Sequence, residues 1–164
     1  MKIEHLAIWA KDIEKIKTFY PEFFELSANE KYFNPTKKFS SYFLLFASGA
    51  RIELMNRPEI SKQLEDLEQN LGLSHFAIAL GSKRKVDDLT HTLRIKGYSI
   101  LGEPRTTGDG YYESIIADPE GNQIELTDKE FGNKTKSRIS NLITDSKFLI
   151  LLYLTRVKYF EILK

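Results

Sequence analysis

The stretch LSHFAIAL, residues 73–80, has the apolar composition of a buried β-strand, yet His75 interrupts it. A near copy, IEHLAIWA, occupies residues 3–10 with His5 in the equivalent place. The two histidines lie 70 residues apart. Self-similarity at a fixed period indicates a repeated structural unit, so the chain is expected to contain two copies of one module.

The same repeat extends to a pair of glutamates. The segment ARIELMN (50–56) matches NQIELTD (122–128), which places Glu53 over Glu125 at an offset of 72 residues. Each half therefore runs from a strand with a histidine to a strand with a glutamate. Four polar residues at matching places in two halves exceed what composition supplies by chance, so we treat them as one candidate site.

The two halves also share an order of expected elements. In the first half, a strand at 2–9 precedes a helix that Asp12 caps and that Pro21 ends or kinks. In the second half, the strand at 73–80 precedes a helix that Ser82 caps. Further strands follow each helix, so the prediction is an α+β fold made of two βαβββ modules. The repeats are expected at about 1–56 and 72–128, with residues 57–71 as a bridge.

Side chains alternate across a strand, which assigns each polar residue to a face. His5 shares its face with Ala7 and Trp9, and the apolar Leu6 and Ile8 lie on the opposite face. The other three polar residues are likewise backed by apolar neighbours suited to pack under a helix. All four side chains therefore point away from the helix-covered side. If the two sheets curl toward each other, the four can converge in a cleft.

Two imidazoles and two carboxylates form a nitrogen–oxygen ligand set that suits Zn, Ni, Co, Fe or Mn. The chain has no cysteine, so thiolate sites and disulfides are excluded. Two carboxylates in one buried site repel each other, and a bound cation removes that cost. Each residue alone is more often an ordinary core or surface residue, and only the four together favour a metal. The remaining histidine, His91, falls outside the repeat and is expected at the surface.

These features resemble the vicinal oxygen chelate superfamily, which contains glyoxalase I, the extradiol dioxygenases, the fosfomycin-modifying thiol transferases and the bleomycin-binding proteins. The resemblance covers residues 1–129, and its marks are HLAIWAKDIEKIKTFY, IELMN, HFAIAL and DPEGNQIEL. It implies that the two βαβββ modules form a half-open, barrel-like sheet around a metal cleft, often completed by dimerisation. A homodimer acting on a small-molecule substrate is therefore expected.

Within that family, the ligand pattern is most similar to glyoxalase I, whose His, Glu, His, Glu set matches His5, Glu53, His75 and Glu125. The resemblance implies a divalent-metal-dependent lyase or isomerase, with Ni or Zn as the expected metal. It also implies that Glu125 is the base for proton transfer through an enediolate and that Glu53 is its partner. One alternative is an iron-dependent extradiol dioxygenase using His5, His75 and Glu125. Another is a metal-free resistance protein that binds a small molecule.

The expected substrate pocket departs from glyoxalase I. In bacterial versions an arginine follows the first ligand histidine by four residues, and this chain has Trp9 there. The metal chemistry therefore resembles that family more closely than the glutathione pocket does. The residues expected to line the pocket are Trp9, Tyr42, Asn56, Arg57 and Tyr112.

Charge and hydropathy narrow the class of protein further. The net charge of +1 gives no reason to expect a nucleic-acid partner. The longest apolar run, FLILLYL at 148–154, is too short to span a bilayer, and the N-terminus lacks a signal-peptide core, so a cytoplasmic location is expected. Residues 130–164 read as a basic linker and an apolar segment. We expect this segment to pack on the domain or on a second subunit, and the alternative is a basic amphipathic segment lying on a membrane surface.

Overall fold

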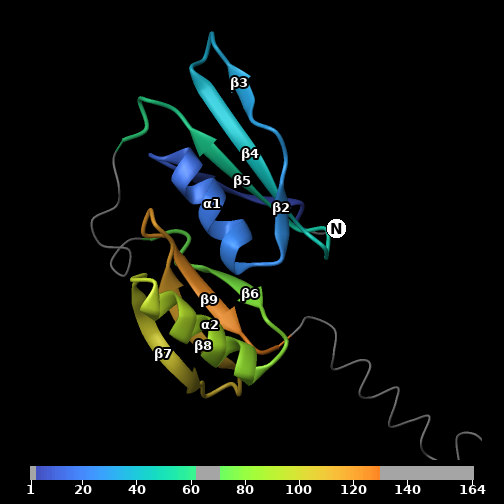
Figure 1. Ribbon diagram of the computed structural model, residues 1–164, viewed down its shortest axis with the longest axis vertical. Coiled ribbons are helices and arrows are strands. Elements are labelled where there is room, and N and C mark those ends of the chain that lie inside the picture. The colour runs from blue at the N-terminus through green and yellow to red at the C-terminus, as the bar shows by residue number, and fades with distance from the viewer. Residues whose placement is uncertain (1–2, 62–70, 130–164) are drawn as a thin grey trace, which may run out of the picture. The chain divides into compact units, whose positions relative to one another are not determined.

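The computed structural model describes residues 3–61 and 71–129, which form two α+β halves (Figure 1). The first half contains β1 (His5–Trp9), α1 (Ile13–Phe23), β2 (Leu26–Ala28), β3 (Tyr32–Asn34), β4 (Phe39–Phe46) and β5 (Arg51–Asn56). The second contains β6 (Phe76–Ala79), α2 (Lys83–Ile95), β7 (Ile100–Thr106), β8 (Tyr112–Ala117) and β9 (Gln123–Thr127). The predicted α+β fold class is confirmed.

Each half forms its own sheet, and the two sheets have the same strand order. The first runs β1-β5-β4-β2 and the second β6-β9-β8-β7. In both, the first and last strands of the half pair in parallel, and the other pairs are antiparallel. A parallel pair needs a long crossover connection, which the helix and the remaining strands of each half supply.

The first sheet has one strand more than the βαβββ pattern because its outer edge is divided. β2 pairs with the C-terminal end of β4 and β3 pairs with its N-terminal end. Between them, Asn29 replaces the missing ladder: Phe43 N–H donates to the Asn29 side-chain oxygen at 2.6 Å, and Asn29 N–H donates to the Phe43 carbonyl at 3.0 Å. The βαβββ module is thus present in both halves, with a broken edge strand in the first.

The helices begin where the sequence predicts them. The side chain of Asp12 accepts from Lys15 N–H, and that of Ser82 accepts from Lys85 N–H, so both N-caps are confirmed. Pro21 does not end the helix, since α1 continues to Phe23, and the alternative, that Pro21 kinks it, stays a prediction. Proline removes one backbone donor, but the ring of Phe23 packs on Tyr98 with centroids 5.2 Å apart and holds the last turn.

A buried hydrogen bond joins the two halves. The Tyr20 hydroxyl on α1 donates to Asp118 Oδ2 at 2.9 Å, and both residues are almost completely buried. Asp118 Oδ1 also accepts from the backbone N–H groups of Glu120 and Asn122 at 2.9 Å each. Burial, together with the negative charge of Asp118, raises the pKa of Tyr20 well above its usual value. This tyrosine therefore remains a neutral donor that fixes α1 to the turn before β9.

Two of the sequence predictions concern residues outside the described ranges. Part of the bridge, 62–70, and the C-terminal segment, 130–164, are not among the residues that the structure describes. Within 3–61 and 71–129, no helix is long and apolar enough to cross a membrane.

The Tyr20→Phe substitution keeps the ring in the core and removes only its hydroxyl. Asp118 then loses one donor in a buried site, so we expect the free energy of unfolding to fall by about 1–3 kcal/mol. Urea denaturation of the wild type and the variant measures the difference. Tyr32→Phe, at a tyrosine that is 54% exposed, serves as the control and should change stability little. Equal stability of the Tyr20→Phe variant and the wild type would contradict the role given to this bond.

Candidate metal centre

The first half places His5 and Glu53 on neighbouring strands with their side chains toward each other. β1 and β5 pair in parallel, with Ala7 opposite Glu53, so His5 stands one step along the same face. Nε2 of His5 lies 3.7 Å from Oε2 of Glu53. The other ring nitrogen, Nδ1, is 2.5 Å from Oε2 of Glu4. Glu4 thus holds one side of the imidazole ring, and Nε2 faces Glu53.

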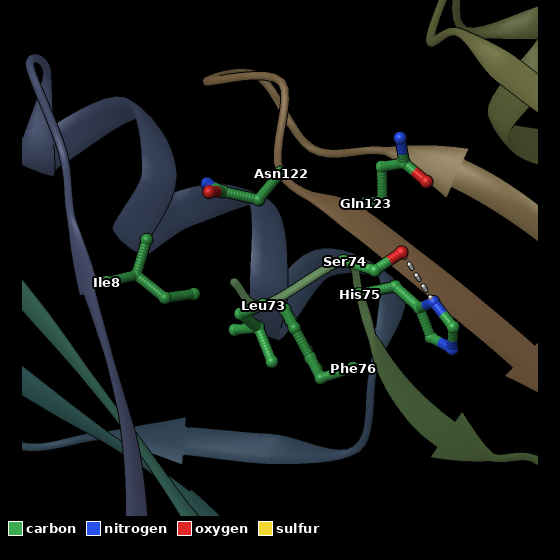
Figure 2. Close-up of a pocket in the computed structure, with 7 residues that line it drawn as sticks. All are labelled: Ile8, Leu73, Ser74, His75, Phe76, Asn122 and Gln123. Atoms are coloured by element: carbon green, nitrogen blue, oxygen red, sulfur yellow. Dashed lines mark hydrogen bonds between the residues drawn. The ribbon is translucent and has the colours of Figure 1, made fainter. Parts of the chain in front are cut away.

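The second half repeats this arrangement. β6 and β9 pair in parallel with Ala77 opposite Glu125, and His75 stands two residues before Ala77. Nε2 of His75 lies 3.3 Å from Oε2 of Glu125. Its Nδ1 is 3.3 Å from the hydroxyl of Ser74, a hydrogen bond drawn in Figure 2. In each half, the preceding residue therefore holds Nδ1, and Nε2 is directed to the glutamate.

The two pairs also match in burial. The side chains of His5 and His75 are 38% and 39% exposed, and those of Glu53 and Glu125 are 17% and 16% exposed. Each pair is therefore a half-buried imidazole–carboxylate unit that opens to one side. Among the described residues, no group of three or more His, Asp or Glu side chains is close enough to hold a metal ion together. Each half thus brings together one imidazole and one carboxylate, two groups of the kind that bind divalent metals.

A third acidic residue, Glu113 on β8, lies beside the second pair. β8 pairs with β9 so that Ile115 opposes Glu125 and Glu113 opposes Thr127, which puts Glu113 on the same face. Its side chain accepts from Nη2 of Arg105 at 3.1 Å. Burial, followed by the negative charge of Glu113, raises the pKa of Glu125 above its usual value, and His75 opposes that shift. Sequence reasoning missed Glu113, although the alternation in YESIIA could have identified its face.

Of the aromatic residues expected to line the pocket, only Trp9 lies on the face of the His–Glu pairs. It is 41% exposed, and its ring makes an edge contact with Phe39 at 6.2 Å between centroids. Tyr42 neighbours Phe43, the residue opposite Glu53, and therefore points to the other face, where its hydroxyl donates to Oε2 of Glu14 on α1 at 3.1 Å.

Tyr112 is placed in the same way in the second half. Its neighbour Glu113 lies on the face of Glu125, so Tyr112 points toward α2. Its hydroxyl donates to Oδ1 of Asp87 on that helix at 2.7 Å. Tyr42 and Tyr112 therefore pack between sheet and helix, away from the two His–Glu pairs.

The two polar residues expected beside Glu53 follow it at the end of β5. The side-chain amide of Asn56 donates to the carbonyls of Ala10 and Lys11 at 2.8 and 3.2 Å. It thereby fixes the connection between β1 and α1. Arg57 comes next, and its Nε is buried without a hydrogen-bond partner among the residues that the structure describes.

A small pocket lies next to His75 (Figure 2). Its volume of about 50 Å³ is far below the several hundred Å³ typical of ligand pockets, so it has room for water-sized groups only. The lining residues are Ile8, Leu73, Ser74, His75, Phe76, Asn122 and Gln123. A pocket of this size does not provide a substrate site.

Known proteins share this fold and part of its sequence. A protein from Bacillus subtilis, the uncharacterized protein YqjT, is 27% identical over 127 residues, which cover 76% of this chain and 96% of that protein. Glyoxalase I from Zea mays is similar with a TM-score of 0.65 and 26% identity, over 78% of this chain and 44% of that one. The chain thus spans less than half the length of the Zea mays enzyme.

Two further solved structures show the same fold at lower identity. Glyoxalase I from Leishmania major has a TM-score of 0.65 and 23% identity, over 88% of this chain and 99% of that one. The fosfomycin resistance protein FosX from Listeria monocytogenes has a TM-score of 0.60 and 16% identity, over 81% and 95%. The sequence model of the Glyoxalase/Bleomycin resistance protein/Dioxygenase superfamily matches residues 2–126. The chain belongs to this superfamily.

Proposed function

We propose that this protein is a divalent-metal-dependent lyase or isomerase, similar to glyoxalase I, and that His5, Glu53, His75 and Glu125 bind its metal. The observation that carries the proposal is the repeated pairing of an imidazole Nε2 with a carboxylate, at 3.7 and 3.3 Å, in both halves. The donor set is two nitrogens and two oxygens, which fits Ni or Zn and also Fe, Co or Mn. The equivalent placement of Glu53 and Glu125 favours four ligands over a triad of two histidines and one carboxylate.

We further propose that a homodimer completes the site. Each half supplies two ligands, and a catalytic zinc or nickel site takes three or four from the protein. In a two-fold symmetric dimer, the His5–Glu53 pair of one copy meets the His75–Glu125 pair of the other. The symmetry then produces two equal sites per dimer, each with the full set of four donors.

In this proposal Glu125 is the base. Once bound, a divalent metal polarises the adjacent oxygens of the substrate as a Lewis acid. Glu125 takes a proton from the carbon next to the carbonyl and returns it to the neighbouring carbon. In the metal-free protein, burial and the negative charge of Glu113 raise the pKa of Glu125, which favours it over an ordinary carboxylate as a proton acceptor. Glu53 has no neighbouring carboxylate of this kind, because Ser41 stands at the position on β4 that Glu113 has on β8.

Metal content tests the ligand assignment. We expect His5→Ala and His75→Ala each to weaken Ni or Zn binding by about a hundredfold or more, because each removes a nitrogen donor. Calorimetry and metal analysis of the purified proteins measure the loss. His91→Ala is the matched control, since His91 is exposed on α2 and should bind no metal. Unchanged binding in both ligand variants would remove the basis of the proposal.

Mixing the two defective variants tests the shared site. In a heterodimer of His5→Ala and His75→Ala chains, one site carries both changes and the other carries neither. Random re-pairing of an equal mixture should therefore restore about a quarter of the wild-type metal sites. Restoration of none would show that each site is built within one chain or that the dimer does not form as proposed.

The roles of the two glutamates predict unequal kinetic effects. With the hemithioacetal of methylglyoxal and glutathione as the first assay substrate, Glu125→Gln should lower kcat by about 10²–10⁴. Glu53→Gln should lower it less, because Glu53 is the partner of the base and Glu125 itself takes the proton. Metal content, measured on the same samples, separates lost chemistry from lost metal. If Glu125→Gln keeps its metal and its full kcat, Glu125 is not the base.

Glu113, the carboxylate beside Glu125, leads to a prediction about the pKa of Glu125 in the metal-free protein. In Glu113→Gln the nearby negative charge is removed, so the pKa of Glu125 should fall but stay above its usual value, because burial remains. NMR titration of the Glu125 carboxyl carbon in the metal-free protein measures this. Glu103→Gln, at an exposed residue paired with Arg94, is the control and should leave the pKa of Glu125 unchanged.

A further inference from the structure

An open row of aromatic side chains lies on the face of the first sheet that carries His5 and Glu53. We call Trp9, Tyr32, Phe39 and Phe43 the aromatic face. Phe39 makes ring contacts with both Trp9 and Tyr32, at 6.2 Å between centroids in each case. Trp9 is 41% exposed and Tyr32 is 54% exposed. Several aromatic rings that are this exposed to solvent and lie together provide an apolar surface for a partner or ligand.

The aromatic face adjoins the first His–Glu pair. The ring of His5 makes an edge contact with Phe43 at 5.7 Å, and Phe43 stands opposite Glu53 in the ladder. Trp9 stands opposite Met55, one step beyond the Ala7–Glu53 pair. One such step along a strand is about 7 Å, roughly the length of a phenyl ring. A ligand with oxygens near Glu53 can therefore place a directly attached ring against Trp9.

The small side chain at Ala7 leaves this space open. Ala7 lies between His5 and Trp9 on β1, on the same face and opposite Glu53. It is exposed, so no side chain of the described residues covers the route from the glutamate to the tryptophan. The face is thus apolar at Trp9, open at Ala7 and ligating at the His5–Glu53 pair.

Two polar residues of β5, Arg51 and Asn56, are engaged by other groups of the protein. Arg51, the cation on this face of β5, pairs with Glu4 and lies over the ring of Phe43 at 4.2 Å. The amide of Asn56 donates to two backbone carbonyls. A ring near Trp9 would therefore find the other rings of the aromatic face.

We propose that the aromatic face binds the aromatic ring of a substrate in which the ring is attached directly to a hydroxyl-bearing or carbonyl carbon. The substrate class is an aryl-substituted 2-hydroxycarbonyl compound, whose two adjacent oxygens lie at the His5–Glu53 end. For the chemistry at those oxygens, this inference rests on the proposed function. The preference for a ring rests only on the side chains of the aromatic face.

Mandelate and lactate form a matched pair of probes, since both are 2-hydroxy acids of the same charge and differ in a phenyl against a methyl group. Calorimetry should find that the protein binds mandelate about tenfold or more tightly than lactate. Mandelate should also change the tryptophan fluorescence, which reports on this face because Trp9 is the single tryptophan of the chain. An affinity ratio near one, or a ratio without a fluorescence change, overturns the inference.

Variants locate the ring. Trp9→Ala should reduce the mandelate-to-lactate ratio to about threefold or less. Phe33→Ala is the control, because Phe33 is 61% exposed on β3 but alternates with Tyr32 and therefore lies on the opposite face. If Trp9→Ala does not fold by circular dichroism, Trp9→Leu replaces it and should lower the ratio in the same direction. A ratio that Trp9 variants leave unchanged, or that Phe33→Ala removes, places the ring elsewhere and overturns the inference.

The same samples separate this inference from the proposed function. Metal content is measured first, and the ratio is then measured with and without added Ni or Zn. Protein that holds metal but shows no preference for mandelate overturns the inference and leaves the proposed function standing. Protein that holds no metal but still prefers mandelate, through Trp9, supports the inference and overturns the proposed function.

Discussion

The parallel pairing of the first and last strand of each half is the constraint on which the candidate site depends. In both halves the glutamate stands opposite the residue two positions after the histidine, Ala7 in one and Ala77 in the other. The same register thus brings an imidazole and a carboxylate to the same diagonal on the same face. A slip of one residue would turn the histidine under the helix. The buried back faces under α1 and α2 oppose such a slip.

This part of the structure could be predicted because it follows from period and repetition alone. The back-face residues Ile52, Leu54, Ile124 and Leu126 are all buried, as the alternation in the two IEL strands indicates. Once the apolar face is assigned, the polar face follows without knowledge of the loops. The repeat then indicates which polar residues correspond, because a duplicated module keeps its strand order and its register.

Other features depend on pairings that the sequence does not contain. Whether Tyr42 or its neighbour Phe43 lies beside Glu53 is decided by the antiparallel register of β4 and β5. That register depends on the length of the turn between them. The approach of Glu113 to Glu125 depends on the β8–β9 register in the same way. Proline propensity alone likewise did not show that α1 continues past Pro21 to Phe23, whose ring contacts Tyr98.

The two halves have kept equal histidine–glutamate pairs and changed what surrounds them. In the first half, Glu4 holds the histidine and rings lie beyond the glutamate; in the second, Ser74 holds the histidine and Glu113 lies beside the glutamate. Burial and the charge of Glu113 raise the pKa of Glu125, whereas the neighbour across the ladder from Glu53 is the ring of Phe43. The repeated strand pairing therefore accounts for the symmetric part of the candidate site, and the flanking strands account for the differences between the halves.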